Sequence, residues 1–101
     1  MTIDETLLTE DERFSDLKDA KKRFNESEGE LMFRFLNKTG QHEAQDRAFI
    51  AQEHVESYLC DHPFVIFDKE SWRLAKIASQ CLADLYQRIG NVKLDDRTAA
   101  R

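Results

Sequence analysis

The chain has 101 residues, 41% of them apolar, which suits a single domain with one modest hydrophobic core. Its formal net charge is −5, and positions 1–30 carry most of the acidic excess, so an overall attraction to nucleic acid is disfavoured. The sequence has no basic-then-apolar leader and no apolar run of about 20 residues, so we expect a cytoplasmic protein without a membrane span. In that setting Cys60 and Cys81 are expected to be free thiols.

A long first helix is predicted from residue 10 to about residue 38. Thr9 and Glu12 match the capping box, in which the two side chains exchange hydrogen bonds with the backbone of the first turn. Apolar residues then recur at steps of three and four, as on one helix face: Phe14, Leu17, Phe24, Leu31 and Phe35. Gly29 interrupts this pattern and costs about 1 kcal/mol in a helix interior. We therefore expect a continuous helix with a weak point at Ser27–Gly29.

A second helix is predicted over residues 41–61, with a face formed by Ala44, Ala48, Ala51 and Val55. It should end before Pro63, because the residue that precedes a proline is pushed out of the helical conformation. The next four residues, Phe64–Phe67, are apolar where a polar turn would be typical, and we expect an irregular linker. Two interpretations stay open: a hydrophobic plug that closes the core, which we favour, or a contact surface for a second chain.

The last helix, predicted over residues 69–90, is the element around which the others are expected to pack. Asp68 should cap its first turn, and Gly90 should adopt the left-handed conformation after its last turn. Its apolar residues form two overlapping stripes that are wider than the face of a surface helix: Trp72, Leu74, Ala75, Ile77, Ala78, Cys81, Leu82, Leu85 and Ile89. Such a helix must be covered on two sides, and Cys81 is expected to be a small core residue.

One cluster of residues could suggest a metal or catalytic site, but its spacing argues against both. His54, Cys60 and His62 lie within nine residues. At 100° per residue, His54 and Cys60 point about 240° apart, and His62 lies about 12 Å from His54 along the axis, too far for one ion. A catalytic pair of Cys60 with a histidine has as little support, and no phosphate loop or nucleophile motif is present. We expect no catalytic residue, no metal and no cofactor.

Four apolar residues are candidates for a partner interface: Phe49, Ile50, Phe64 and Phe67. Phe49 and Ile50 lie off the apolar face of a helix that is otherwise charged. Exposed apolar groups of this kind often mark interfaces, where aromatic residues dominate the binding energy. We expect Phe49 to face a partner and Phe64 to lie in the core. The basic cluster within Lys18–Arg23 alternates with acidic residues and predicts a solvated helix face rather than a nucleic-acid patch.

The order of these elements resembles that of the YlbF/YmcA family of small helical bacterial proteins, which includes YheA-like members. The resemblance covers about residues 11–90. It rests on an aromatic, Lys-rich first helix with the polar and acidic stretch Asn25–Glu28, and on the segment Leu59–Val65, similar to L-x-x-x-P-x-V, before the last helix. The aromatic residue expected after the valine falls one place early, at Phe67, the connection after the first helix is short, and no Cys-rich tail is present. The resemblance implies an all-α, often dimeric protein without catalytic activity, acting in complexes that regulate RNA processing and development.

The sequence therefore predicts an all-α, three-helix antiparallel bundle, a single helical domain over residues 1–101 with frayed ends at 1–8 and 92–101. The first helix would be about 43 Å long and the last about 33 Å. The end of the longer first helix, with Phe14 and Leu17, would extend beyond the last helix and would lack cover in a monomer, so we expect a homodimer. The predicted function is a non-enzymatic interaction or regulatory module with another protein as partner. The alternative is an acidic phage- or plasmid-type inhibitor that masks a basic surface on a host protein.

Overall fold

The structure, a computed structural model, describes residues 8–94, and all regular secondary structure in this range is helical. Its elements are α1 (Glu10–Phe24), α2 (Glu28–Phe35), α3 (Lys38–His54), the π-helical segment η2 (Val55–Cys60), α4 (Pro63–Phe67) and α5 (Lys69–Asn91). The predicted all-α class is confirmed. The predicted three helices are replaced by five α helices within the described range. The expected fraying falls mainly on residues 1–7 and 95–101, which lie outside it.

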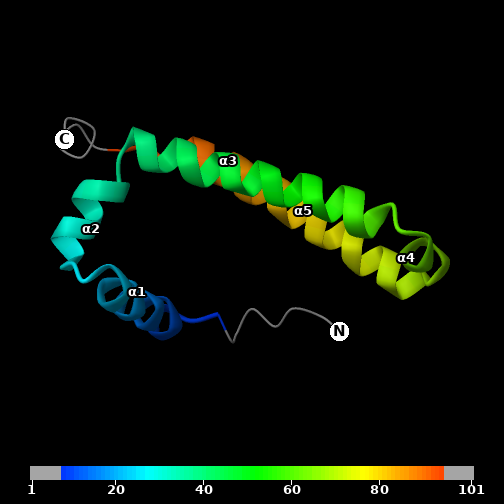
Figure 1. Ribbon diagram of the computed structural model, residues 1–101, viewed down its shortest axis with the longest axis horizontal. Coiled ribbons are helices and arrows are strands. Elements are labelled where there is room, and N and C mark those ends of the chain that lie inside the picture. The colour runs from blue at the N-terminus through cyan, green and yellow to red at the C-terminus, as the bar shows by residue number, and fades with distance from the viewer. Residues whose placement is uncertain (1–7, 95–101) are drawn as a thin grey trace.

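Helices α3 and α5 lie antiparallel, side by side, and form a long hairpin with η2 and α4 at its closed end (Figure 1). Small side chains allow the two helices to approach closely: Ala48 and Ala75 are buried, and Ser79 is only 4% exposed. Polar groups also cross the interface, since the Gln52 Nε2 donates to the Ser79 Oγ at 3.5 Å. The helices therefore meet along a narrow face of small and polar residues, which leaves most large apolar side chains outside it.

Gln41 closes the open end of the hairpin. Its Nε2 donates to the backbone carbonyls of Ile89 at 2.7 Å and Val92 at 2.9 Å. Ile89 lies in the last turn of α5 and Val92 is its C-cap residue, so this side chain joins the start of α3 to the end of α5. The left-handed cap expected at Gly90 is wrong, since Gly90 stays helical. A Cβ at Gly90 would lie 2.4 Å from the Gln45 Nε2, so the glycine instead permits the close approach of α3.

Helices α1 and α2 form an arm that leaves the open end of the hairpin and curves back along one side (Figure 1). The predicted continuous helix 10–38 is wrong, because the chain turns at Asn25, which adopts the left-handed φ of 54°. A complete capping box then starts α2: the Ser27 Oγ accepts from the Glu30 N–H, and the Glu30 carboxylate accepts from the Ser27 N–H. The predicted weak point is thus a full break, with a new helix start behind it.

A second break lies at Leu36 and Asn37, where the sequence predicted the gradual end of the first helix. The Asn37 side chain accepts from the Gly40 N–H at 2.8 Å and so begins α3 at Lys38, three residues earlier than expected. A Cβ at Gly40 would lie 1.8 Å from the Phe35 carbonyl oxygen. Gly40 is therefore needed where α2 crosses the start of α3.

The core of the described chain is thin. Its buried apolar residues are Leu31, Ala48, Cys60 and Ala75, and no large side chain in the described range is fully buried. The radius of gyration is 16.9 Å, against about 13 Å for a compact domain of this length. The fold therefore leaves much of its apolar surface without a partner from the same chain.

Candidate interaction surface

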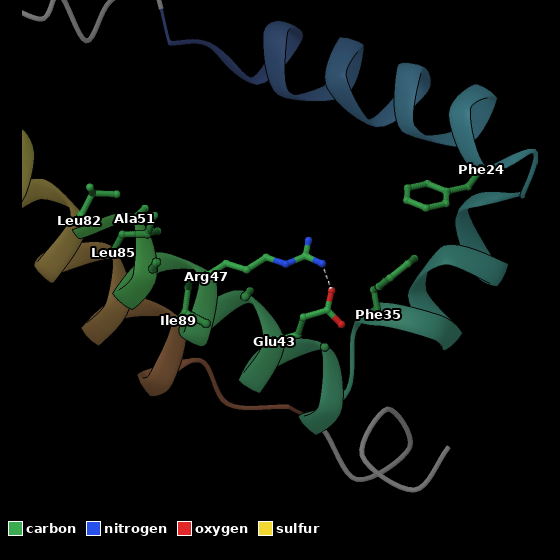
Figure 2. Close-up of a pocket in the computed structure, with 11 residues that line it drawn as sticks. Phe24, Phe35, Glu43, Arg47, Ala51, Leu82, Leu85 and Ile89 are labelled. Carbon is green, nitrogen blue, oxygen red and sulfur yellow. Dashed lines mark ion pairs between the residues drawn. The ribbon is translucent and has the colours of Figure 1, made fainter. Parts of the chain in front are cut away.

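A groove lies between the arm and the hairpin (Figure 2). It has a volume of about 600 Å³. Phe24 and Phe35 line it from the arm, and Leu82, Leu85 and Ile89 line it from α5. In Figure 2 Arg47 extends from α3 into this groove, where its guanidinium pairs with the Glu43 carboxylate at 2.8 Å. The groove is thus apolar on two sides and holds one exposed ion pair.

The arm wall of the groove is aromatic and carries an arginine. The rings of Phe24 and Phe35 lie 5.3 Å apart at a tilt of 53°, a favourable arrangement for two aromatic groups. The Arg34 guanidinium lies 4.9 Å from the centre of the Phe35 ring and also pairs with Glu26. A second hollow on the arm itself is lined by Leu17, Leu31 and Met32. Aromatic residues, methionine and arginine are the types enriched in protein interfaces.

The apolar connection Phe64–Phe67 is the short helix α4 rather than an irregular linker. Pro63 takes its first position, where the missing N–H does no harm, and the His62 Nδ1 accepts from the Phe64 N–H. The prediction that Phe64 lies in the core is wrong for the single chain, because its side chain is 71% exposed and that of Phe67 is 88% exposed. A helix of five residues is too short to turn all its apolar side chains onto the hairpin.

The other two candidate residues, Phe49 and Ile50, lie on α3 and are about half exposed. The Phe49 ring packs against the ring of Tyr86 with centres 6.1 Å apart. Phe49 takes no part in lining the groove, whose α3 residues include Arg47 and Ala51. A turn of 100° per residue places Phe49 and Arg47 about 160° apart around the helix. The structure therefore does not bring the four candidates into one patch: Phe49 and Ile50 lie along α3, and Phe64 and Phe67 lie at the closed end.

Helix α5 exposes most of its apolar stripe. Cys81, predicted as a core residue, is exposed, and the prediction is wrong because the hairpin is packed on Ala75 and Ser79 instead. Leu74, Ile77 and Leu85 are each more than a third exposed. The sequence predicts that this helix needs cover on two sides, and residues 8–94 leave much of its apolar stripe exposed.

Cys60 is the buried cysteine, and the π-helical segment explains why. An uninterrupted α helix would place Cys60 about 120° away from Ala48 around the axis. The wider hydrogen bond from the Asp61 N–H to the Glu56 carbonyl, at 3.1 Å, winds the chain more slowly and returns Cys60 to the buried side. Burial raises the pKa of the Cys60 thiol, and the Glu56 carboxylate raises it further. The thiol is therefore protonated and unreactive at neutral pH.

His54 and His62 make separate contacts and do not come together. The His54 ring meets the Tyr58 ring edge-on at 5.3 Å, whereas His62 caps α4. Among residues 8–94, no three His, Cys, Asp or Glu side chains group closely enough to hold a metal ion. Within the same range no helix is both long enough and apolar enough to cross a membrane.

Comparison with known proteins adds no relative: no family model, no curated protein and no solved structure matches this chain. The resemblance to the YlbF/YmcA family stays a prediction. The groove residues Phe24, Phe35, Leu82 and Leu85 were not among the predicted interface residues. One signal could have found them: Ser27 and Glu30 form a second capping box, which separates α1 from α2 and lets the arm fold back.

Proposed function

We propose that this protein is a non-enzymatic interaction module that works as a homodimer and binds another protein. The observation that carries the proposal is the amount of apolar surface left open: eighteen large apolar side chains of the described range are more than a third exposed. Single exposed apolar residues are normal, but contiguous apolar surfaces of this kind mark interaction sites. Here they form a groove, a helix face and an aromatic closed end.

The composition of these surfaces supports a protein as the partner. The groove presents aromatic rings, aliphatic side chains and one arginine paired with a glutamate, and aromatic residues and arginine are enriched in protein interfaces. Its two walls come from different parts of the fold, so an occupant would also hold the arm against the hairpin. A regulatory role in a complex that controls RNA processing or development is the form of this function that the family resemblance suggests.

The alternative function, masking of a basic host surface by acidic residues, has less support. Helix α1 carries five acidic and five basic residues, so it is neutral overall, and its ends are charged in opposite senses. Salt separates the two mechanisms. Binding by charge masking weakens steeply as ionic strength rises, whereas apolar docking does not. We expect the complex with the partner to survive 0.5 M salt.

The test of partner binding uses Phe49→Asp, with Gln87→Asp as its matched control at an exposed polar position on α5. Both variants should keep the wild-type helical circular dichroism; Gln87 is exposed, and Phe49 is half exposed, so Phe49→Asp should melt only slightly lower through the loss of its contact with the Tyr86 ring. Pull-down from the source cell should lose its specific partner with Phe49→Asp and retain it with Gln87→Asp. A folded Phe49→Asp protein that retains every wild-type partner would refute the role of this position. Phe67→Asp at the closed end provides the same test of the second candidate patch.

A further inference from the structure

We propose that a second copy of this chain covers the exposed apolar face of α5, antiparallel to the first, with the two-fold axis passing between the two α5 helices at the level of Ser79 and Gln80. This inference rests on the proposed homodimer and deepens it, because it names the face, the register and the groups that meet. The groove between the arm and the hairpin is then completed by the second copy. Each copy of the chain provides the same surface to the other, as in a two-fold interface.

The face in question lies beside the hairpin interface. Ala75 and Ser79 point towards α3, and at 100° per residue the neighbouring side of the helix holds an unbroken apolar strip. The strip consists of Leu74, Ile77, Ala78, Cys81, Leu82 and Leu85. Leu82 is half-buried at the edge of the hairpin, and the others are exposed. No described element of the same chain covers their outer side.

The spacing of this strip is symmetric. Two antiparallel copies of α5 that are related by a two-fold axis bring together residues equally far from the axis on either side. An axis level with the midpoint between Ser79 and Gln80 brings three pairs to the same height: Leu74 with Leu85, Ile77 with Leu82, and Ala78 with Cys81. At 100° per residue, Leu74 and Leu85 lie about 20° apart around the helix and face each other at the middle of the strip, whereas Ile77 and Leu82 lie about 140° apart and border the strip on its two sides. The smallest side chains lie at the centre, where they allow close approach, and the largest lie further out.

Charged residues at the ends of α5 agree with the same register. Glu70 and Arg88 are 18 residues apart, which is five full turns, so they lie on one side of the helix beside the strip. In the antiparallel pair, Glu70 of each copy lies within one residue's rise of Arg88 of the partner copy. Within the single chain the Glu70 carboxylate pairs with the Arg73 guanidinium at 2.9 Å, so the partner's Arg88 would join this pair, once at each end of the interface. A partner of unrelated sequence would need to reproduce both the apolar spacing and these charges, whereas a second copy supplies them automatically.

The arm lies on the same side as this face, because Phe24 and Phe35 line one groove with Leu82 and Leu85. A second copy seated on the face therefore also contacts the arm. The register brings Lys69, the first residue of α5 in the second copy, level with Gly90, near a hollow of about 200 Å³ lined by Phe35, Ile89 and Val92. The exposed aromatic residues of α4, which precede Lys69, therefore lie towards the open end of the opposite hairpin.

Cys81 tests the register without any substitution. It lies one and a half residues from the proposed axis, so its Cα and that of its symmetry mate would be about 6–7 Å apart if the helix axes are 8–9 Å apart. That separation is compatible with a disulfide. Oxidation by diamide, which accepts the two electrons and two protons that the thiols release, should cross-link Cys81 to Cys81. Cys60 is buried and should stay reduced.

The experiment combines light scattering at tens of micromolar with diamide cross-linking and mass spectrometry of the wild-type chain. We expect a mass of about twice 11.9 kDa and a cross-linked dimer joined through Cys81, which Cys81→Ser abolishes without changing the mass in solution. A monomer would overturn the inference and the homodimer together. A dimer that does not cross-link through Cys81 would overturn only the register and face proposed here. Neither result bears on partner binding through Phe49, which is measured separately.

Substitutions on the two sides of α5 give an independent readout. Ala78→Glu places like charges together at the centre of the interface and should weaken dimerisation about a hundredfold or more. Its matched control, Gln80→Glu, lies on the outer side of α5 and should leave the dimer unchanged. Glu70→Arg should weaken the dimer several-fold and Arg88→Glu should restore it in the double variant. Equal effects of Ala78→Glu and Gln80→Glu, or no rescue in the double variant, would count against this register.

Discussion

Replacing Gln41 by alanine is expected to destabilise the fold through the loss of two specific hydrogen bonds. The Gln41 Nε2 donates to the carbonyls of Ile89 and Val92, and the site is partly buried. A protein hydrogen bond contributes about 0.5–1.5 kcal/mol net, so the two together should contribute about 1–3 kcal/mol. For a domain of this size, each kcal/mol corresponds to about 4–8 °C in melting temperature. Gln41→Ala should therefore melt roughly 5–20 °C below the wild type.

The matched control for this loss is Gln87→Ala, which changes the same residue type at an exposed position of α5 and should cost no more than about 0.5 kcal/mol. Urea unfolding followed by circular dichroism at one protein concentration gives both values. Gln41→Glu keeps the size of the side chain but turns a carboxylate towards two carbonyl oxygens. At neutral pH it should therefore be less stable than Gln41→Ala.

The pH dependence of Gln41→Glu provides the decisive comparison. The two carbonyls disfavour the ionised form, so the pKa of the new carboxyl is raised above its unfolded value of about 4.3. The protonated carboxyl can donate one hydrogen bond, so its stabilising contribution is present below the unfolded pKa and is lost as pH rises through the folded pKa. If Gln41→Ala and Gln87→Ala lose equal, small amounts of stability, or if Gln41→Glu shows no pH dependence beyond that of the wild type, Gln41 does not hold the hairpin closed.

Three further predictions concern the arm and the buried thiol. Asn25→Gly should leave the stability nearly unchanged whereas Asn25→Val should cost about 1–2 kcal/mol in urea unfolding, because only glycine and asparagine readily take the left-handed conformation. The Ser27 backbone N–H and hydroxyl lower the pKa of the Glu30 carboxyl. The stability that Glu30 contributes through the capping box is therefore present above its unfolded pKa and is lost as pH falls through the lowered folded pKa. An NMR titration should show the lowered pKa of Glu30, and Ser27→Ala should return it towards its ordinary value. Cys60 should resist iodoacetamide until denaturant is added, because burial keeps its thiol protonated, and rapid labelling in the native protein would contradict its placement.

The helical class and the last helix could be predicted because their signals are local. Asp68 caps α5 as expected, by accepting from the Ser71 N–H, and the predicted range 69–90 ends one residue from the observed Asn91. Thr9 likewise accepts from the Glu12 N–H and starts α1. Caps of this kind depend on residues three apart in the sequence, so no knowledge of the tertiary structure was needed.

The breaks in the first predicted helix were missed because two local signals competed. The apolar repeat from Phe14 to Phe35 continues in phase across Asn25 and predicts one continuous helix, whereas the capping box at Ser27 and Glu30, which the prediction did not use, begins a new helix. Apolar periodicity records which residues are to be buried, whereas the cap determines where the backbone turns. The first helix was also predicted to end near residue 38, whereas in the structure Asn37 caps the start of α3.

The burial pattern could not be predicted because it depends on which side of α5 the hairpin uses. The wide apolar stripe indicates that two sides of the helix need cover, but it does not say which side packs on α3. The choice falls on Ala75 and Ser79, where small and polar groups permit a close approach and hydrogen bonds to α3. That is why Cys81 and Leu85 are exposed, and why the groove residues escaped prediction. A periodic pattern is equally consistent with cover from the same chain or from another.

The π-helical segment η2 holds one residue more than an α helix would need to reach the same point. The extra residue changes the direction of the side chains that follow it: without η2, the residues after Cys60 would be rotated by about 100° around the helix axis relative to α3. Removing one residue from Val55–Cys60 would let the helix continue regularly and would swing α4 around the axis, away from its present side of the hairpin. The direction in which the aromatic residues at the closed end point is therefore encoded in the length of this segment rather than in its composition. Among related chains, a single-residue deletion here would redirect that end to a different surface while the hairpin itself stayed intact.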